Sequence, residues 1–141
     1  MRLSILIPIY LTLSSFVFVP NQSIQSILTQ FTNDLAKRGL DVDTSTVDIY
    51  VMNELVQERW GECQPGYRTR PLILIKRSII RGPHLKRILY HELGHCLLHY
   101  YNHTKTGLMK ATIDPVKDGE LTEQDIDELV QIVTILPIGI K

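Results

Sequence analysis

The sequence lacks an excess of charge of either sign, since 15 lysines and arginines balance 15 aspartates and glutamates. It has no basic stripe of the kind that neutralises phosphates, which excludes a nucleic acid as its partner. It also lacks internal repeats and low-complexity segments, and 44% of its residues are hydrophobic, which excludes a disordered chain. At 141 residues, the chain is long enough for one globular domain with an apolar core.

Cysteine is scarce as well, and Cys63 and Cys96 are the only two in the chain. If the protein is exported, this even count allows one disulfide, which would join the Gly- and Pro-rich segment around Cys63 to the segment around Cys96. Two free thiols, buried as small apolar residues, are the alternative. The sequence leaves both arrangements open.

Long hydrophobic runs are absent apart from residues 3–19, which follow Arg2 and end at Pro20. One basic residue, an apolar stretch somewhat short of a bilayer crossing and a following turn are typical of a secretory signal peptide. No clear small-residue cleavage site is present, so cleavage near Ser23 and an uncleaved membrane tether are both open. The alternative, a buried part of the folded domain, fits poorly with Pro8.

This N-terminal segment sets the predicted domain organisation. Residues 1–21 are expected to be a signal peptide or membrane tether, and residues 22–141 are expected to form the folded domain. The protein is accordingly expected to be secreted or extracytoplasmic, or tethered to a membrane through its N-terminal segment alone. The sequence makes no prediction of oligomeric state.

Histidine, in contrast, is concentrated in one short segment that holds all five: His84, His91, His95, His99 and His103. Residues 91–95 read His-Glu-Leu-Gly-His, the H-E-x-x-H pattern, within a predicted helix over residues 85–100. Because side chains four positions apart lie one turn above each other on a helix, His91 and His95 can bind one zinc ion. Glu92 points off that line and can reach a zinc-activated water without being a ligand. The pattern therefore predicts the site of a zinc metallopeptidase.

The flanking residues favour this interpretation over a chance coincidence of two histidines and a glutamate on a surface helix. Gly94 costs about 1 kcal/mol inside a helix, so the close approach of another group explains it better than helix stability does. Five further residues give the helix an apolar side that can pack in a core: Ile88, Leu89, Leu93, Cys96 and Leu97.

A third metal ligand is expected beyond the helix, because a catalytic zinc usually has three protein ligands. His103 is the predicted one, since the preceding Asn102 tolerates the left-handed conformation in which the chain can turn back toward the metal. His99 is a rival, although a straight helix would turn it partly off the metal face. The acidic alternatives are Asp114, Glu120, Glu123 and Glu128.

Hydrophobic periodicity and turn residues predict an α+β fold. Thr122, with Asp125 three residues later, is expected to cap the last helix. If the strand at residues 72–76 lies at the edge of its sheet, an extended peptide can pair with it by strand addition. Besides the motif helix, the expected elements are helices at residues 22–38 and 121–135, strands at residues 47–52 and 71–80 (the latter ending near Lys76), and loops at residues 60–70 and 102–119.

Residues 91–103, followed by Gly107-Leu108-Met109, resemble the extended zinc signature of the metzincins, and of their matrixin-like branch in particular. In that branch a third histidine follows the helix, and a methionine in a tight turn forms a floor under the metal. The resemblance covers roughly residues 71–133. It implies a small zincin-like metallopeptidase domain, in which a mixed sheet packs against the active-site helix and a C-terminal helix. Met109 would be the supporting methionine.

The spacing of this chain departs from the family pattern. Leu98 and Tyr101 stand where the family has a glycine and its third histidine, so His103 comes two residues late. Residues 122–129 are similar to the opening of the terminal helix in matrixins. No structural zinc or calcium loop and no inhibitory pro-segment with a cysteine is visible in the sequence.

Together, the motif and the resemblance predict a zinc endopeptidase that hydrolyses a peptide or protein substrate. His91, His95 and His103 are the expected metal ligands, and Glu92 is the expected general base and then general acid. Two other functions stay open. One is a metal-dependent hydrolase of a non-peptide amide, and the other is a non-catalytic zinc-binding interaction module, which would have no need for Glu92.

Overall fold

The computed structural model describes residues 23–66 and 68–135. The predicted signal peptide or membrane tether at residues 1–21 lies outside them. Within the described part of the chain, no helix is both long and apolar enough to span a bilayer.

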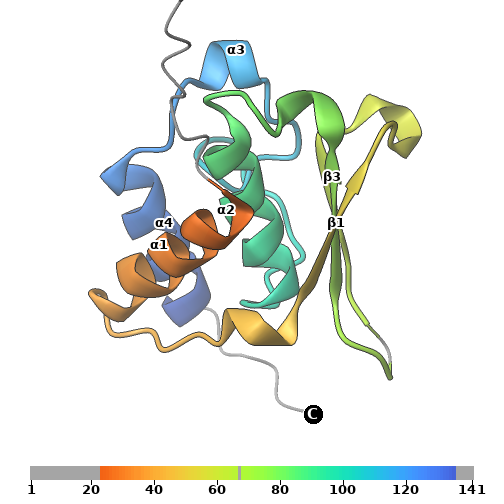
Figure 1. Ribbon diagram of the computed structural model, residues 1–141. Helices are drawn as coiled ribbons and strands as arrows, with labels where there is room; N and C mark the ends of the chain where they lie inside the picture. The colour runs from red at the N-terminus through yellow and green to blue at the C-terminus, as the bar shows by residue number, and fades with distance from the viewer. Residues whose placement is uncertain (1–22, 67, 136–141) are drawn as a thin grey trace, which may run out of the picture.

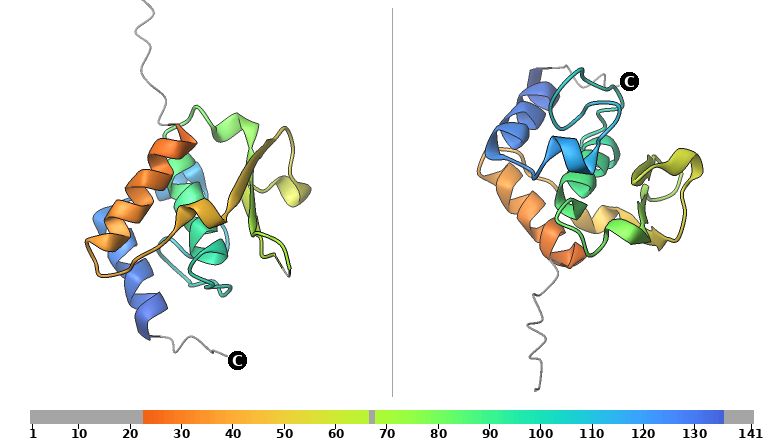
Figure 2. Two further views of the ribbon diagram at one scale, coloured as in Figure 1. Left: turned by 60° about the horizontal axis from the view of Figure 1, so that its bottom comes forward. Right: turned by 90° about the horizontal axis from the view of Figure 1, so that it is seen from above.

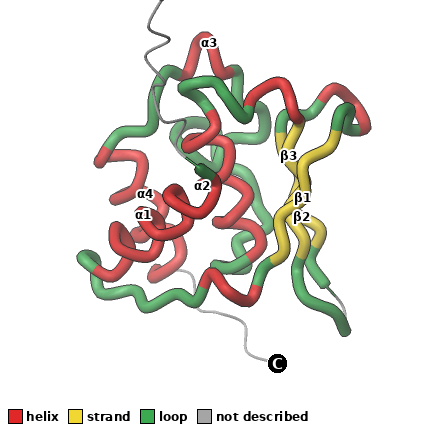
Figure 3. Tube along the Cα trace, viewed as in Figure 1, coloured by secondary structure: helices red, strands yellow, loops and turns green. Residues whose placement is uncertain are grey.

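Helices and strands occupy separate parts of the molecule, which confirms the predicted α+β class (Figures 1 and 3). α2 lies between the sheet on one side and α1 with α4 on the other, and the views in Figure 2 keep this order. Three short 3₁₀ turns lie at Thr44–Thr46, Val56–Glu58 and Arg77–Ile79. The helices are α1 (Ile24–Ala36), α2 (Leu85–Cys96), the short α3 (Pro115–Asp118) and α4 (Glu123–Ile135), and the strands are β1 (Asp48–Met52), β2 (Gly61–Gln64) and β3 (Leu72–Lys76).

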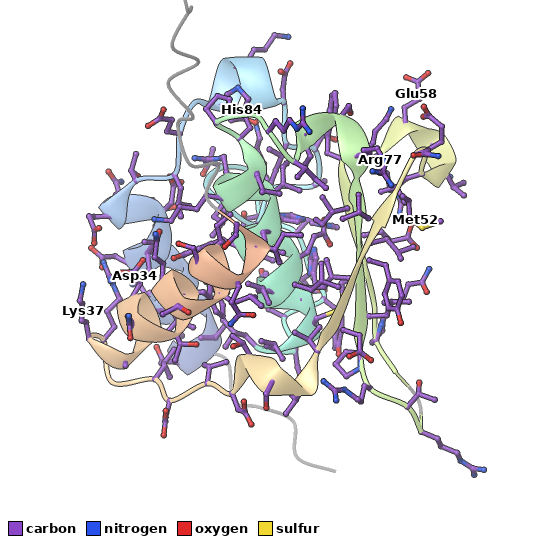
Figure 4. All side chains as sticks on the ribbon, viewed as in Figure 1. Asp34, Lys37, Met52, Glu58, Arg77 and His84 are labelled. Atoms are coloured by element: carbon purple, nitrogen blue, oxygen red, sulfur yellow. A yellow bond between two sulfur atoms is a disulfide. The ribbon has the colours of Figure 1, made fainter. Side chains whose placement is uncertain are left out.

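The sheet is mixed and has the strand order β1-β3-β2. β1 runs parallel to β3, whereas β2 runs antiparallel to it. Side chains alternate between the two faces of a strand, and along β3 the inward residues Ile73 and Ile75 are fully buried. Met52 on β1 points away from the helices and is 42% exposed (Figure 4). The sheet therefore has one covered face, which packs on α2.

The motif helix α2 forms the centre of the core, because all of its twelve residues except Lys86 are buried. On its far side, Tyr90 meets Phe31 of α1 edge to face, with ring centroids 4.9 Å apart. The Tyr90 hydroxyl donates a hydrogen bond to the Asp34 carboxylate at 2.8 Å. Packing and this hydrogen bond fix α2 against α1.

A buried ion pair joins α4 to α2. The Arg87 guanidinium donates to both carboxylate oxygens of Asp125, at 2.9 and 3.0 Å. Asp125 also accepts from the Thr122 backbone N–H at 2.9 Å, while its own N–H donates to the Thr122 hydroxyl, so the predicted helix cap is confirmed. Burial alone would raise the pKa of Asp125, but the hydrogen bonds from Arg87 and Thr122 hold it below its ordinary value.

Replacement of Asp125 by asparagine is expected to lower the free energy of unfolding at neutral pH by about 3–5 kcal/mol, because it leaves the Arg87 guanidinium buried without its counter-charge. The pKa of Asp125 is lower in the folded than in the unfolded chain. Its contribution is therefore present above about pH 4 and is lost as the pH falls through the folded-state pKa. Urea unfolding of both proteins should show their difference shrinking on acidification, and a pH-independent difference would contradict this assignment.

Two predictions about the strands are wrong. Residues 60–70 are not all loop, because Gly61–Gln64 forms β2. The local sequence favours a turn there, but pairing with the apolar β3 supplies backbone partners that no local pattern reveals. The strand at residues 72–76 is confirmed as β3, but it lies in the centre of the sheet. Peptide addition to this strand is therefore excluded.

The motif helix is also shorter than the predicted 85–100, since α2 ends at Cys96. His99 has a φ of +54°, a left-handed conformation that does not continue a helix. The Tyr100 N–H then donates to the Gly94 carbonyl at 3.2 Å, so the chain folds back on the end of α2. This early turn brings the following loop alongside the helix. The predicted loop at residues 102–119 contains α3.

Candidate metal centre

His91 and His95 lie one turn apart on α2 with their rings close together. The ring centroids are 4.6 Å apart, and the two Nε2 atoms are 3.0 Å apart. Both side chains lie in the interior, with His91 6% and His95 9% exposed. The helix therefore presents two ring nitrogens to the same point, as the spacing of the motif predicts.

His103 reaches these two histidines from the loop that follows α2. Its ring stacks on that of His91 with centroids 5.7 Å apart, and its centroid lies 5.0 Å from that of His95. One ring nitrogen of each histidine lies within 4.8 Å of the other two. The Thr104 N–H donates to the Met109 carbonyl at 2.9 Å and so closes the loop that directly follows His103. The structure thus brings the three expected ligands together.

The alternative ligands lie elsewhere. His99 is exposed, and its Nδ1 is 3.1 Å from the Tyr101 hydroxyl. His84 lies at the start of α2, before the motif (Figure 4). Within residues 23–66 and 68–135, the three-histidine group is the one cluster able to hold a metal ion. It contains none of the acidic alternatives, Asp114, Glu120, Glu123 and Glu128.

Backbone carbonyls orient the two histidines of the helix. Nδ1 of His91 lies 2.7 Å from the Leu108 carbonyl, and Nδ1 of His95 lies 2.5 Å from the Tyr100 carbonyl. A carbonyl oxygen only accepts, so each Nδ1 carries the proton and each Nε2 holds a free lone pair. Two lone pairs at 3.0 Å repel each other unless a cation shares them, so the donor set fits a metal ion.

Burial keeps these imidazoles uncharged. It lowers the pKa of His91 to about 4, although the hydrogen bond to Leu108 opposes the change. Burial also lowers the pKa of His95, against the effect of its hydrogen bond to Tyr100. Both rings are therefore neutral near pH 7, which is the form that binds metals. A set of neutral imidazoles suits a divalent transition metal.

Gly94 lies between the two helical ligands at the point where Met109 approaches α2. A Cβ atom on Gly94 would lie 2.8 Å from the Met109 sulfur, which is too close for normal packing. Met109 follows Leu108, whose carbonyl orients His91, and both residues are 1% exposed. The prediction that Gly94 admits a close neighbour is confirmed, and the neighbour is the methionine named by the family resemblance.

Glu92 lies in contact with β2. Its carboxylate accepts a hydrogen bond from the Cys63 backbone N–H, and a Cβ atom on Gly61 would lie 2.9 Å from its Cγ and Oε1. Burial raises the pKa of Glu92 to about 8, and the negative charge of Glu62 adds to this rise. The hydrogen bond from the Cys63 N–H and the positive charge of Arg59 lower the pKa, but by less. Without a cation the carboxyl group is therefore mostly protonated near pH 7, and a neighbouring positive charge would favour the carboxylate.

The three histidines and Glu92 line one cavity of about 520 Å³. Its walls come from the turn before β2, from β2 itself, from α2 and from the loop that joins α2 to α3. The remaining lining residues are Gln57, Glu58, Arg59, Trp60, Gly61, Glu62, Cys63, Ile88, Tyr101, Ala111, Thr112 and Ile113. β2 is an edge strand in the described part of the chain, so the cavity lies beside a strand edge without a strand partner there.

Cys63 and Cys96 form a disulfide, which excludes the alternative of two free thiols. Cys63 lies in β2, and Cys96 is the last residue of α2, directly after His95. The bond therefore ties the strand beside the cavity to the helix that carries His91 and His95.

Sequence reasoning missed the groups that hold the motif side chains in place. Gly61 packs against Glu92, and backbone groups of Cys63, Tyr100 and Leu108 hydrogen-bond to the motif side chains. Every residue type has a backbone N–H or carbonyl, so no residue pattern identifies these contacts in advance. Gly61 carries only the general signal of a turn residue.

No protein-family model matches this chain, and no curated protein or solved structure matches it. A function for the protein is therefore inferred from the geometry of the three histidines, Glu92 and the cavity that they line.

Proposed function

We propose that the protein is a zinc-dependent endopeptidase. One observation carries the proposal: three histidines and Glu92 converge on a single cavity beside an edge strand. Structural zinc sites have four protein ligands, whereas catalytic sites have three and keep one position for water or substrate. The described residues offer three ligands here. This count, with a carboxylate next to the ligands, favours hydrolysis over a binding module.

The three histidines would hold the zinc. When bound, zinc supplies Lewis-acid activation of a water molecule and of the carbonyl group to be cleaved. The protein contributes a fixed arrangement of ligands, because the Leu108 and Tyr100 carbonyls hold the rings of His91 and His95. Such outer contacts typically change metal affinity or activity by about 10–100-fold when they are removed.

Glu92 is the residue to which we assign proton transfer. It lies on the same helix as two of the ligands and lines the same cavity, but it does not belong to the histidine group. Its carboxylate takes a proton from the attacking water and passes it to the leaving amine. The Cys63 N–H and the close contact with Gly61 restrict the positions that this carboxylate can adopt.

β2 supports a peptide as the substrate. This strand pairs with β3 along one edge, and no strand among the described residues pairs with its other edge. Residues 60–63 also line the cavity, so a peptide chain extended along β2 would pass the metal centre. A small non-peptide amide would make no use of this edge.

Two further aspects of the proposal follow from the same site. The motif helix, His103 after it and Met109 against Gly94 support a zincin-like domain related to the matrixin-like metzincins. The disulfide supports an exported protein, secreted or membrane-tethered, because disulfides persist in oxidising compartments.

The test is peptide cleavage by the full chain loaded with zinc, using a diverse peptide library read by mass spectrometry. We expect cleavage at internal peptide bonds, loss of cleavage on addition of a chelator and recovery when zinc is returned. Absence of cleavage by a folded, zinc-bound protein would overturn the peptidase proposal and leave the non-peptide amide hydrolase as the function to test.

A further inference from the structure

β2 is short and is held by β3 on one side alone. Its four residues pair antiparallel with β3, with Gly61 opposite Ile75 and Cys63 opposite Ile73. The Lys76 N–H donates to the Trp60 carbonyl at 2.9 Å, which marks that position as a hydrogen-bonded pair. Bonded and non-bonded pairs alternate in an antiparallel ladder, so the backbone groups of Gly61 and Cys63 face the free edge.

Glu92 contacts one backbone group on this edge. The Cys63 N–H, which has no strand partner within residues 23–66 and 68–135, donates to the Glu92 carboxylate. Gly61, two residues earlier, leaves room for the same side chain, since a Cβ atom there would lie 2.9 Å from two of its atoms. The position of β2 relative to α2 therefore sets the position of the Glu92 carboxylate.

The disulfide fixes that relative position. It joins Cys63 to Cys96, which is 1% exposed and follows His95 at the end of α2. Cys63 lines the cavity of the metal centre, and Cys96 lines a second cavity of about 420 Å³ together with Leu97, Leu98 and Val133. Cys63 is partly exposed, whereas Cys96 is buried, so a small reductant has to approach the bond from the side of Cys63.

We propose that Cys63 is a positioning residue for Glu92 and that the Cys63–Cys96 disulfide makes the activity of this site depend on its redox state; the proposal rests on the peptidase function above. In the oxidised protein the Cys63 N–H holds the Glu92 carboxylate beside the metal centre. In the reduced protein β2 keeps its pairing with β3 but loses its covalent tie to α2. None of the three histidines belongs to β2, so the reduced protein still binds the metal.

The redox step is a thiol–disulfide exchange with a dithiol reductant. One thiolate of the reductant attacks a sulfur of the disulfide and forms a mixed disulfide, and its second thiolate releases the protein. The reductant gives up two electrons and two protons and closes to its own disulfide. The Sγ–Sγ bond of the protein breaks, and Cys63 and Cys96 each gain a thiol hydrogen. Oxidised glutathione reverses the change.

The experiment compares oxidised and reduced full chain. Dithiothreitol reduces the protein and is then removed by gel filtration without oxygen, and zinc is restored before measurement. Three quantities are recorded on the same samples: zinc per chain, kcat for a peptide cleaved in the library, and the hydrogen-exchange rate of the Cys63 amide by NMR. Because these two cysteines are the only ones in the chain, the reductant has no other disulfide within it to reduce.

We expect reduction to leave zinc content unchanged, to lower kcat by about 10–100-fold, as a displaced catalytic group does, and to speed exchange of the Cys63 amide. Oxidised glutathione should restore both kcat and the slow exchange of the Cys63 amide. The double variant Cys63→Ser/Cys96→Ser should match the reduced protein without responding to dithiothreitol, and if it does not fold, the reduced natural chain carries the test. In oxidised Glu92→Ala the Cys63 amide should also exchange faster, because its acceptor is gone.

Unchanged kcat after complete reduction would overturn the proposal. So would loss of zinc in parallel with activity, since the disulfide would then support the metal centre as a whole. If the oxidised protein cleaves no peptide, the peptidase function fails, and the amide still tests the positioning role. Faster exchange of the Cys63 amide in the reduced than in the oxidised protein, with zinc retained, would support that role. An unchanged exchange rate would overturn it.

Discussion

Replacement of Glu92 by glutamine is expected to lower kcat for peptide cleavage by about 10²–10⁴-fold, the usual contribution of a general acid–base group. Glutamine has nearly the same size, and its carbonyl oxygen can still accept from the Cys63 N–H. Its amide, however, cannot take a proton from the attacking water. Steady-state kinetics with a peptide identified in the library measure this change.

The same variant is expected to keep its zinc, because Glu92 is not one of the three clustered histidines. Glu54→Gln is a matched control with the same chemical change. Its side chain is 81% exposed and pairs with Lys76 at 3.2 Å, away from the cavity, so wild-type kcat is expected. Glu92→Gln with more than about a tenth of the wild-type kcat would refute the general-base assignment. Zinc lost together with activity would instead make Glu92 part of metal binding.

The elements that the sequence predicts well are those with a local signal. In α1, Ile27, Phe31 and Leu35 recur at helical spacing, and all three are fully buried. The Thr122–Asp125 cap of α4 and the apolar strand β3 are local patterns of the same kind. β2 has no such pattern, because its strand conformation depends on pairing with β3.

In the candidate site too, the features with a local sequence signal are predicted and the others are not. The meeting of His91 and His95 follows directly from the helical repeat, which any H-E-x-x-H helix has. His103 does reach them, but not for the predicted reason: the left-handed residue is His99, with φ of +54°, and not Asn102. At this early turn the Tyr100 N–H bonds to the Gly94 carbonyl six residues earlier, a backbone contact that any residue type can make and that no residue pattern identifies.

The disulfide and the contacts of Glu92 lie at the limit of sequence reasoning. Two cysteines allow one bridge, but whether it forms depends on the distance between β2 and the end of α2. Because β2 was expected to be loop, neither that distance nor the Cys63 contact with Glu92 was predictable. Because the sequence does not predict β2, it does not predict the contacts that β2 makes with Glu92 either.

The expected third zinc ligand, His103, is the site of the second large predicted effect, which is on zinc affinity. Removal of His103 in His103→Ala is expected to weaken zinc binding by more than about 100-fold, because loss of an outer contact alone already costs about 10–100-fold. Two ring nitrogens would remain, and peptide cleavage should disappear at zinc concentrations that saturate the natural chain. Competition with a chromophoric chelator measures the affinity.

His99→Ala is the matched control, since His99 is the rival histidine of the same loop. It is exposed and makes its contact with Tyr101 instead of the histidine group, so its removal should leave zinc affinity within about threefold of the natural chain. If His99→Ala lost zinc while His103→Ala kept it, the third ligand would be His99. Equal affinity in both variants and the natural chain would mean that two histidines suffice. With His103 two residues later than the metzincin spacing, its measured contribution decides whether the turn at His99 compensates for the longer connection.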